Sequence, residues 1–188
     1  MIKKLLSLIL MLFLFVGLQA QSDSAKTERL RVVKGGIRIQ KTQKLYWENG
    51  FTFDMTCSGL MNYRLHFGLS YVSSRLGSAM GSNAIKQDNY IFSTSYHFRS
   101  SKSLQPIGRI NLGYFYADYE DPIFDVLSNT SIIIGLEVGL VYDFDFPLTV
   151  SLSAGYTLTA GNGTSGPGTL YPIYYQMSVY YTLFDQRK

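Results

Sequence analysis

Two histidines, His66 and His97, are the side chains of this chain best suited to acid–base or metal chemistry. A metal site needs several ligands at suitable spacing, and the sequence contains no spaced cluster of Cys and His residues. A Ser-His-Asp set can be assembled from almost any chain so rich in serine, so it carries no weight here. The sequence therefore predicts no catalytic, cofactor-binding or metal-binding residue, and both histidines are interpreted as hydrogen-bonded interior groups.

Charged residues form a second group, because they recur on one face of an alternating pattern. With His66 and His97 they make up a predicted structural polar network in the interior: Arg38, Glu48, Asp54, Arg64, Arg99, Arg109, Glu137 and Asp143. Lys34 shares this face. The positions of the intervening turns set Asp54 opposite Arg64 on the neighbouring strand. They set Glu48 opposite Arg38, and opposite charges paired across strands are favourable.

The elements that position these residues are predicted to be β-strands, because apolar and polar residues alternate from residue 30 onward. In the clearest segment, Phe51, Phe53 and Met55 fall on one face, whereas Thr52 and Asp54 fall on the other. The same alternation predicts eight strands, at roughly 30–40, 45–57, 63–71, 89–99, 109–116, 132–143, 148–158 and 173–183.

The connections between these segments alternate in length. Those at 57–62, 99–105 and 143–147 are short, whereas those at 74–87, 118–129 and 160–168 are longer and more polar. An even number of strands can close into a barrel, which leaves no unpaired edge. The sequence therefore predicts an all-β fold, an eight-stranded antiparallel up-and-down barrel.

The size of such a barrel decides which face points outward. Eight strands enclose a space that side chains just fill. The large apolar residues of the alternating pattern exceed that space, whereas the opposite face is rich in Gly, Ser and Thr. The apolar face must point outward, where only lipid makes it stable. We therefore expect a transmembrane barrel rather than a soluble, lipocalin-like one, with a polar interior that acts as a plug more than as a pore lining.

Composition agrees with a membrane location. Charged residues make up 16% of the chain, against about 25% in soluble domains. Aromatic residues are predicted to form two rims, as they do at the two interfaces of membrane barrels. The predicted rims consist of Trp47, Tyr71, Tyr90 and Tyr116 at one end, and of Tyr63, Phe98, Phe144 and Tyr181 at the other.

The N-terminal residues predict a cleaved signal peptide. Lys3 and Lys4 precede an apolar run from Leu5 to Val16, and Ala20 offers a small residue for cleavage. The run is shorter than the about 20 residues that a membrane helix needs. We expect four segments: a signal peptide at 1–20, a short periplasmic segment at 21–29, the barrel at 30–184 and a tail at 185–188.

Net charge and cysteine content argue against a nucleic-acid partner and against an internal disulfide. The formal charge is +4, and it falls to +2 without Lys3 and Lys4, so no basic cluster suggests nucleic acid as a partner. Cys57 is the only cysteine, which excludes an internal disulfide.

The signal segment, the eight alternating strands, the long loops on one side and the final Tyr181-Thr182-Leu183-Phe184 resemble the small OmpX/OmpW-type outer-membrane barrels. The resemblance covers residues 30–184. It implies the outer membrane of a Gram-negative cell as the location, with outer-membrane lipid and the barrel-assembly machinery as partners. The terminal aromatic residue serves such proteins as an assembly signal, and here four residues follow Phe184.

Three functions are compatible with this fold. The first is a structural or surface-interaction role, in which the loops at 78–87, 120–129 and 161–168 meet an extracellular ligand or protein. The second is a lipid-modifying enzyme. Lipid-A deacylases of similar size carry a His-x-Ser element, which neither His66-Phe67-Gly68 nor His97-Phe98-Arg99 matches. The third is a narrow channel for ions or small solutes.

Overall fold

The computed structural model describes residues 30–42, 47–57, 64–76, 85–98, 102–119, 129–161 and 172–185. Within these ranges no helix has the length and hydropathy to cross a bilayer. The predicted signal peptide at 1–20, the segment at 21–29 and residues 186–188 lie outside the described residues. So do most residues of the three loops assigned to surface contacts.

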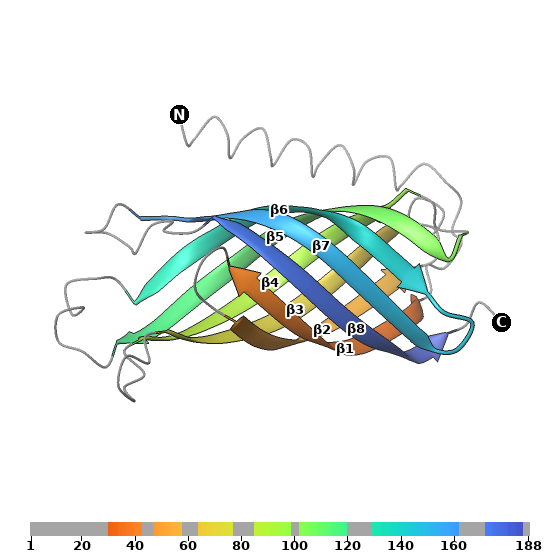
Figure 1. The fold of residues 1–188 in the computed structure, drawn as a ribbon, viewed down its shortest axis with the longest axis horizontal. Coiled ribbons are helices and arrows are strands. Elements are labelled where there is room, and N and C mark those ends of the chain that lie inside the picture. The colour runs from red at the N-terminus through yellow and green to blue at the C-terminus, as the bar shows by residue number, and fades with distance from the viewer. Residues whose placement is uncertain are drawn as a thin grey trace.

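Eight strands form one closed antiparallel barrel (Figure 1). Each strand pairs with its neighbours in the chain, and β1 closes the barrel by pairing with β8. The strands are β1 (Leu30–Thr42), β2 (Trp47–Cys57), β3 (Leu65–Leu76), β4 (Ile85–His97), β5 (Leu104–Tyr119), β6 (Thr130–Asp143), β7 (Leu148–Thr159) and β8 (Ile173–Asp185). The predicted eight-stranded up-and-down barrel is confirmed.

The two ends of the barrel differ in their connections. The β2–β3, β4–β5 and β6–β7 connections lie at one end, together with the start of β1 and the end of β8. We call this the turn end. The other four connections lie at the opposite end, which we call the loop end.

Two strands differ from the prediction by five residues at one end: β3 ends at Leu76 rather than near residue 71, and β5 begins at Leu104 rather than near residue 109. Pro106 argues against a strand because it lacks an N–H donor. Its carbonyl nevertheless accepts a hydrogen bond from the amide of Phe98 at 3.0 Å, and Pro106 pairs with Leu140 of β6. The longer β5 brings Gln105 into the barrel interior, where its side chain is buried.

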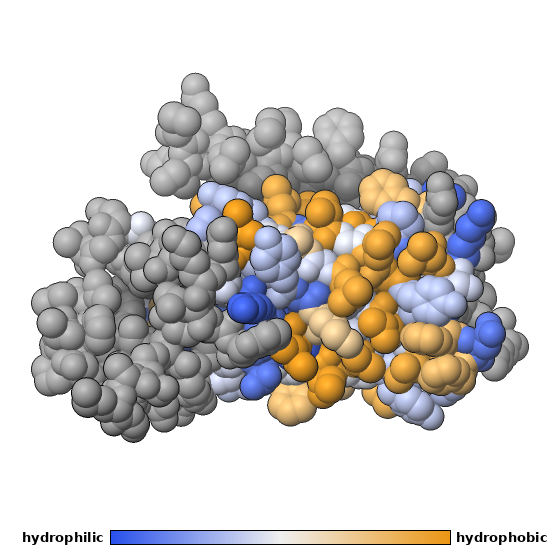
Figure 2. Space-filling view, in the orientation of Figure 1, coloured by the Kyte–Doolittle hydropathy of each residue, from blue (hydrophilic) through white to orange (hydrophobic). Residues whose placement is uncertain are grey.

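The two faces of the strands differ strongly in exposure. In β6, Leu136 and Val138 expose 63% and 68% of their surface, whereas Ile133 and Glu137 are buried. Figure 2 shows apolar side chains over much of the visible part of the described barrel wall. A continuous apolar surface of this extent is stable against hydrocarbon rather than water. The outward face is therefore suited to a membrane.

Aromatic side chains lie in contact near both ends of the barrel. At the turn end the rings of Tyr96 and Phe98 pack edge to face, with centroids 5.1 Å apart. Toward the loop end the rings of Tyr71 and Tyr90 lie 5.4 Å apart. Two predicted rim side chains, those of Trp47 and Tyr63, lie outside the part of the chain that the structure describes.

The interior contains apolar as well as polar side chains. Phe115, Ala117 and Ile133 form a buried cluster toward the loop end of β5 and β6. Ile107 and Val141 are buried nearer the turn end. The alternating pattern placed Phe115 on the inward face, but it predicted a mainly polar interior and did not anticipate the other four residues. These apolar side chains fill space beside the small inward residues.

Candidate functional site

Three groups of inward polar side chains lie at different depths of the described barrel. The central network consists of Arg109, Asn111, Glu137 and Tyr174. The turn-end cluster consists of Lys34, Asp54, His66, His97, Gln105, Asp143 and Thr149. The loop-end bridge consists of Arg38, Gln40 and Glu48.

The central network is built around the carboxylate of Glu137. Arg109 lies opposite Glu137 in the β5–β6 register, and its Nη1 donates to Oε1 at 2.8 Å. The Nδ2 of Asn111 donates to Oε2 at 3.1 Å, and the hydroxyl of Tyr174 donates to the same oxygen at 3.0 Å. The Arg109 and Glu137 side chains are 5% and 0% exposed. Both carboxylate oxygens have donors, which is the condition under which a buried ion pair is tolerated.

Tyr174 reaches Glu137 across β7 because Gly155 leaves space for its ring. These three residues lie side by side in the registers of β8, β7 and β6. A Cβ atom at position 155 would lie 2.3 Å from Cζ of Tyr174 and 2.4 Å from its hydroxyl oxygen. The glycine therefore permits a close approach that any larger residue would block.

Gly155→Ala should push the Tyr174 ring away from Glu137 and destabilise the barrel by about 1–3 kcal/mol, as overpacking does. Gly108→Ala is the matched control, because its Cβ would come no closer than 3.8 Å to the ring of Phe98. Urea unfolding of both variants in lipid vesicles measures the difference. Equal stability of the two variants would mean that the Tyr174 ring does not depend on the space at position 155.

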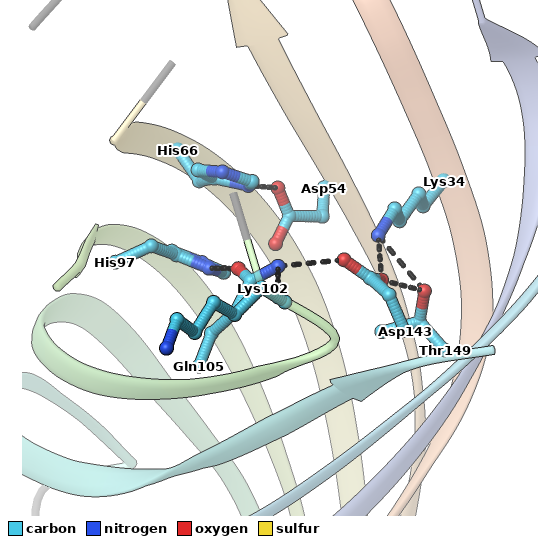
Figure 3. Close-up of polar contacts among 8 residues, drawn as sticks. All are labelled: Lys34, Asp54, His66, His97, Lys102, Gln105, Asp143 and Thr149. Carbon is cyan, nitrogen blue, oxygen red and sulfur yellow. Dashed lines mark hydrogen bonds and ion pairs between the residues drawn. The ribbon is translucent and has the colours of Figure 1, made fainter. Parts of the chain in front are cut away.

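A chain of contacts crosses the lumen within the turn-end cluster (Figure 3). Nδ1 of His66 lies 3.2 Å from Oδ1 of Asp54. The His66 ring stacks on the His97 ring, with centroids 3.7 Å apart and planes 14° apart. Nδ1 of His97 lies 2.6 Å from Oε1 of Gln105.

From Gln105 the chain continues to an ion pair between β6 and β1. Nε2 of Gln105 donates to Oδ2 of Asp143 at 2.9 Å. Nζ of Lys34 donates to Oδ1 of Asp143 at 2.7 Å and to the Thr149 hydroxyl at 2.8 Å. The Thr149 hydroxyl also donates to Asp143 at 2.5 Å. The turn-end cluster thus takes a side chain from every strand except β8.

The contacts in the loop-end bridge differ from the predicted pairing of Glu48 with Arg38. Glu48 lies opposite Gln40 in the β1–β2 register, so the prediction that it lies opposite Arg38 is wrong. Nη2 of Arg38 donates to Oε1 of Gln40 at 2.7 Å, and Nε2 of Gln40 donates to Oε2 of Glu48 at 2.6 Å. The two charges are therefore linked through an amide rather than directly.

The second predicted pair, Asp54 with Arg64, is also wrong. Asp54 lies opposite Gly68 in the β2–β3 register and contacts His66. Arg64 precedes β3 and is exposed, and its Nη1 donates to the hydroxyl of Tyr96 at 3.2 Å. The β2–β3 register is centred further along the chain than the sequence suggested, which changes the partner of Asp54 without changing its face. The prediction that Arg64 lies inside the barrel is also wrong, because its side chain is exposed.

The other predicted network residues that the structure describes lie inside the barrel: Arg109 and Glu137 in the central network, and His66, His97 and Asp143 in the turn-end cluster. Arg99 lies outside the described residues.

The sequence interpretation missed Gln105, which joins the histidines to Asp143. The sequence pattern predicted it to lie in the short connection at 99–105. A signal was present, since Gln105, Ile107 and Arg109 continue the period-two spacing of β5 backward.

The chemistry available to these groups is hydrogen bonding and charge pairing. Among the described residues, no group of three His, Cys, Asp or Glu side chains could hold a metal ion. The contacts join strands across the lumen and neutralise buried charges, which is what a structural plug requires.

By sequence, the chain matches no protein-family model and no curated protein. Its structure is similar to that of neisserial surface protein A, with a TM-score of 0.57 and 14% identity, over 81% of this chain and 95% of that one. It is also similar to the N-terminal β-barrel domain of Pseudomonas aeruginosa OprF, with a TM-score of 0.56 and 12% identity, over 82% of this chain and 100% of that one. The outer membrane protein OprG from Pseudomonas aeruginosa gives a TM-score of 0.52 and 13% identity, over 82% of this chain and 96% of that one. At these identities the likeness shows the fold, and this chain has the fold of small outer-membrane β-barrels, as its resemblance to the OmpX/OmpW type implied.

Proposed function

We propose that this chain is an integral outer-membrane protein, with a closed barrel as a structural scaffold and long loops that carry a surface-interaction role. The apolar outward face and the fold shared with outer-membrane barrels support the location. Loops on a rigid scaffold are where binding functions usually lie. The proposal includes no catalytic role, because His66 and His97 are both engaged in the turn-end cluster.

The observation that carries the scaffold proposal is a set of hydrogen bonds between strands that are not neighbours. Lys34 of β1 bonds to Asp143 of β6, and Tyr174 of β8 bonds to Glu137 of β6. These contacts bridge one intervening strand in the case of Tyr174 and Glu137, and two in the case of Lys34 and Asp143, at two depths of the lumen. Since eight strands leave only enough interior space for side chains, this arrangement favours a plug over a channel.

Shortening the loops within 78–84, 121–128 and 162–168 should leave a barrel that inserts into lipid and keeps its heat-modifiable gel mobility. The contacts that close the lumen lie within the strands, so neither the intact nor the shortened protein should show steady unitary conductance in planar bilayers. Conductance from folded, intact protein would favour the narrow channel instead. Failure of the shortened barrel to insert would make the loops part of the scaffold and remove the separate surface role.

A further inference from the structure

The lumen contains two stacked histidines, and histidine is the residue type whose ordinary titration falls between about pH 5 and pH 8. Their rings lie 3.7 Å apart and nearly parallel, and they are enclosed by the turn-end cluster. The His66 side chain is 13% exposed, and His97 is buried. A proton added to either ring is therefore buried in a site that already contains several charged groups.

The hydrogen bonds of Gln105 define which nitrogen of His97 carries a proton. Nε2 of Gln105 donates to the carbonyl of Lys102 and to Asp143, both at 2.9 Å. Its Oε1 must therefore accept from Nδ1 of His97. In the neutral ring Nε2 is then the unprotonated nitrogen. It is buried, and it has no hydrogen-bond partner among the described residues.

The charged groups that face the pair come from four other strands. Asp54 of β2 contacts His66 directly, and Arg109 of β5 acts electrostatically on both Asp54 and His97. Asp143 of β6 and Lys34 of β1 are joined to His97 through Gln105. A proton on both rings would place two cations face to face at 3.7 Å, near Arg109. The proton that His97 gains must go to Nε2, which has no acceptor among the described residues.

We propose that the His66–His97 pair is an acid-sensitive latch on the turn end of the lumen. At neutral pH the stack completes the contacts that join β2 and β3 to β4 and β5. In acid, a doubly protonated pair requires separated rings, so proton binding shifts the population toward an arrangement in which His97 has left Gln105. The central network contains no histidine and stays closed, so the opening is confined to the turn end of β3, β4 and β5.

This latch goes beyond the proposed function, because a closed barrel would contain it with or without a surface role. It also predicts no pore, since the contacts between Arg109, Glu137 and Tyr174 remain. A loss of the surface role in loop-shortened protein would leave the latch untouched. An experiment can therefore contradict either proposal without contradicting the other.

Amide hydrogen exchange of the full chain in lipid bicelles tests the latch at about pH 7.5 and about pH 4, because the second proton is bound below the range of ordinary histidine titration. After correction for intrinsic rates, acid should reduce protection about tenfold or more at 65–68, 95–97 and 104–107. Protection at 134–138 in β6 should not change. His97→Phe keeps a flat ring on His66 but cannot accept a proton, so it should abolish the response.

Side-chain NMR of the two histidines in the unmodified protein provides a second readout that does not depend on a variant folding. Strong coupling within the stack predicts two separate titration steps, with the exchange response following the second. The latch is overturned if both histidines titrate in one step near the ordinary value of about 6.5. It is also overturned if exchange is the same at both pH values, or if His97→Phe responds to acid as the unmodified protein does.

Discussion

Glu137→Ala should destabilise the folded barrel by about 3–5 kcal/mol, because it leaves the guanidinium of Arg109 buried without its partner. The side chain of Glu137 has no exposed surface, and the side chain of Arg109 is only 5% exposed. The substitution also removes the acceptor for Asn111 and Tyr174, so three donors lose the same partner at once. Unpaired buried donors carry their full desolvation cost.

Urea unfolding in lipid vesicles measures this loss, with the fluorescence of Trp47, the only tryptophan, as the signal. Arg64→Gln is the matched control, since Arg64 is an exposed cation whose loss should cost no more than about 0.5 kcal/mol. Replacing both Arg109 with Met and Glu137 with Leu should recover most of the stability, because an apolar pair of similar volume is often neutral or better. If Glu137→Ala costs no more than Arg64→Gln, the central network does not hold the barrel together.

The face on which each strand residue lies could be predicted from the sequence, because side chains in a strand alternate with a period of two. That period places Arg109, Glu137 and Asp143 on one side for any register shift by an even number of residues. It places Glu48 there as well, although its predicted partner was wrong. A side chain keeps its face under any shift by two residues, so this part of the prediction did not depend on where the turns lie.

The partners of these side chains could not be predicted in the same way. The contact between Lys34 and Asp143 joins residues 109 positions apart, and barrel closure rather than local pattern brings them together. The contact between Tyr174 and Glu137 depends on Gly155, which lies on a third strand. Spacing along one strand contains no information about such three-strand arrangements. The stacking of His66 on His97 was likewise not predictable, although both were expected inside.

Placing a charge on the outward face should be costly at mid-barrel and nearly neutral at the rim, because only the middle of a membrane barrel lies in hydrocarbon. Leu136→Arg changes a residue near the middle of β6 that is 63% exposed. It should destabilise the barrel by about 2–4 kcal/mol in lipid vesicles. Leu104→Arg changes an exposed residue at the turn end of β5, and it should cost about 0–1 kcal/mol.

The comparison of these two variants tests the membrane location, because a soluble barrel predicts a different result. If the outward face met water, arginine at either position would be solvated, and both variants would unfold at nearly the same urea concentration as the unmodified protein. Two equally large losses would instead put Leu104 in hydrocarbon as well, and would move the membrane boundary beyond the turn end. Only a large loss at Leu136 with a small one at Leu104 agrees with an apolar belt that ends near the aromatic contacts of Tyr96 and Phe98.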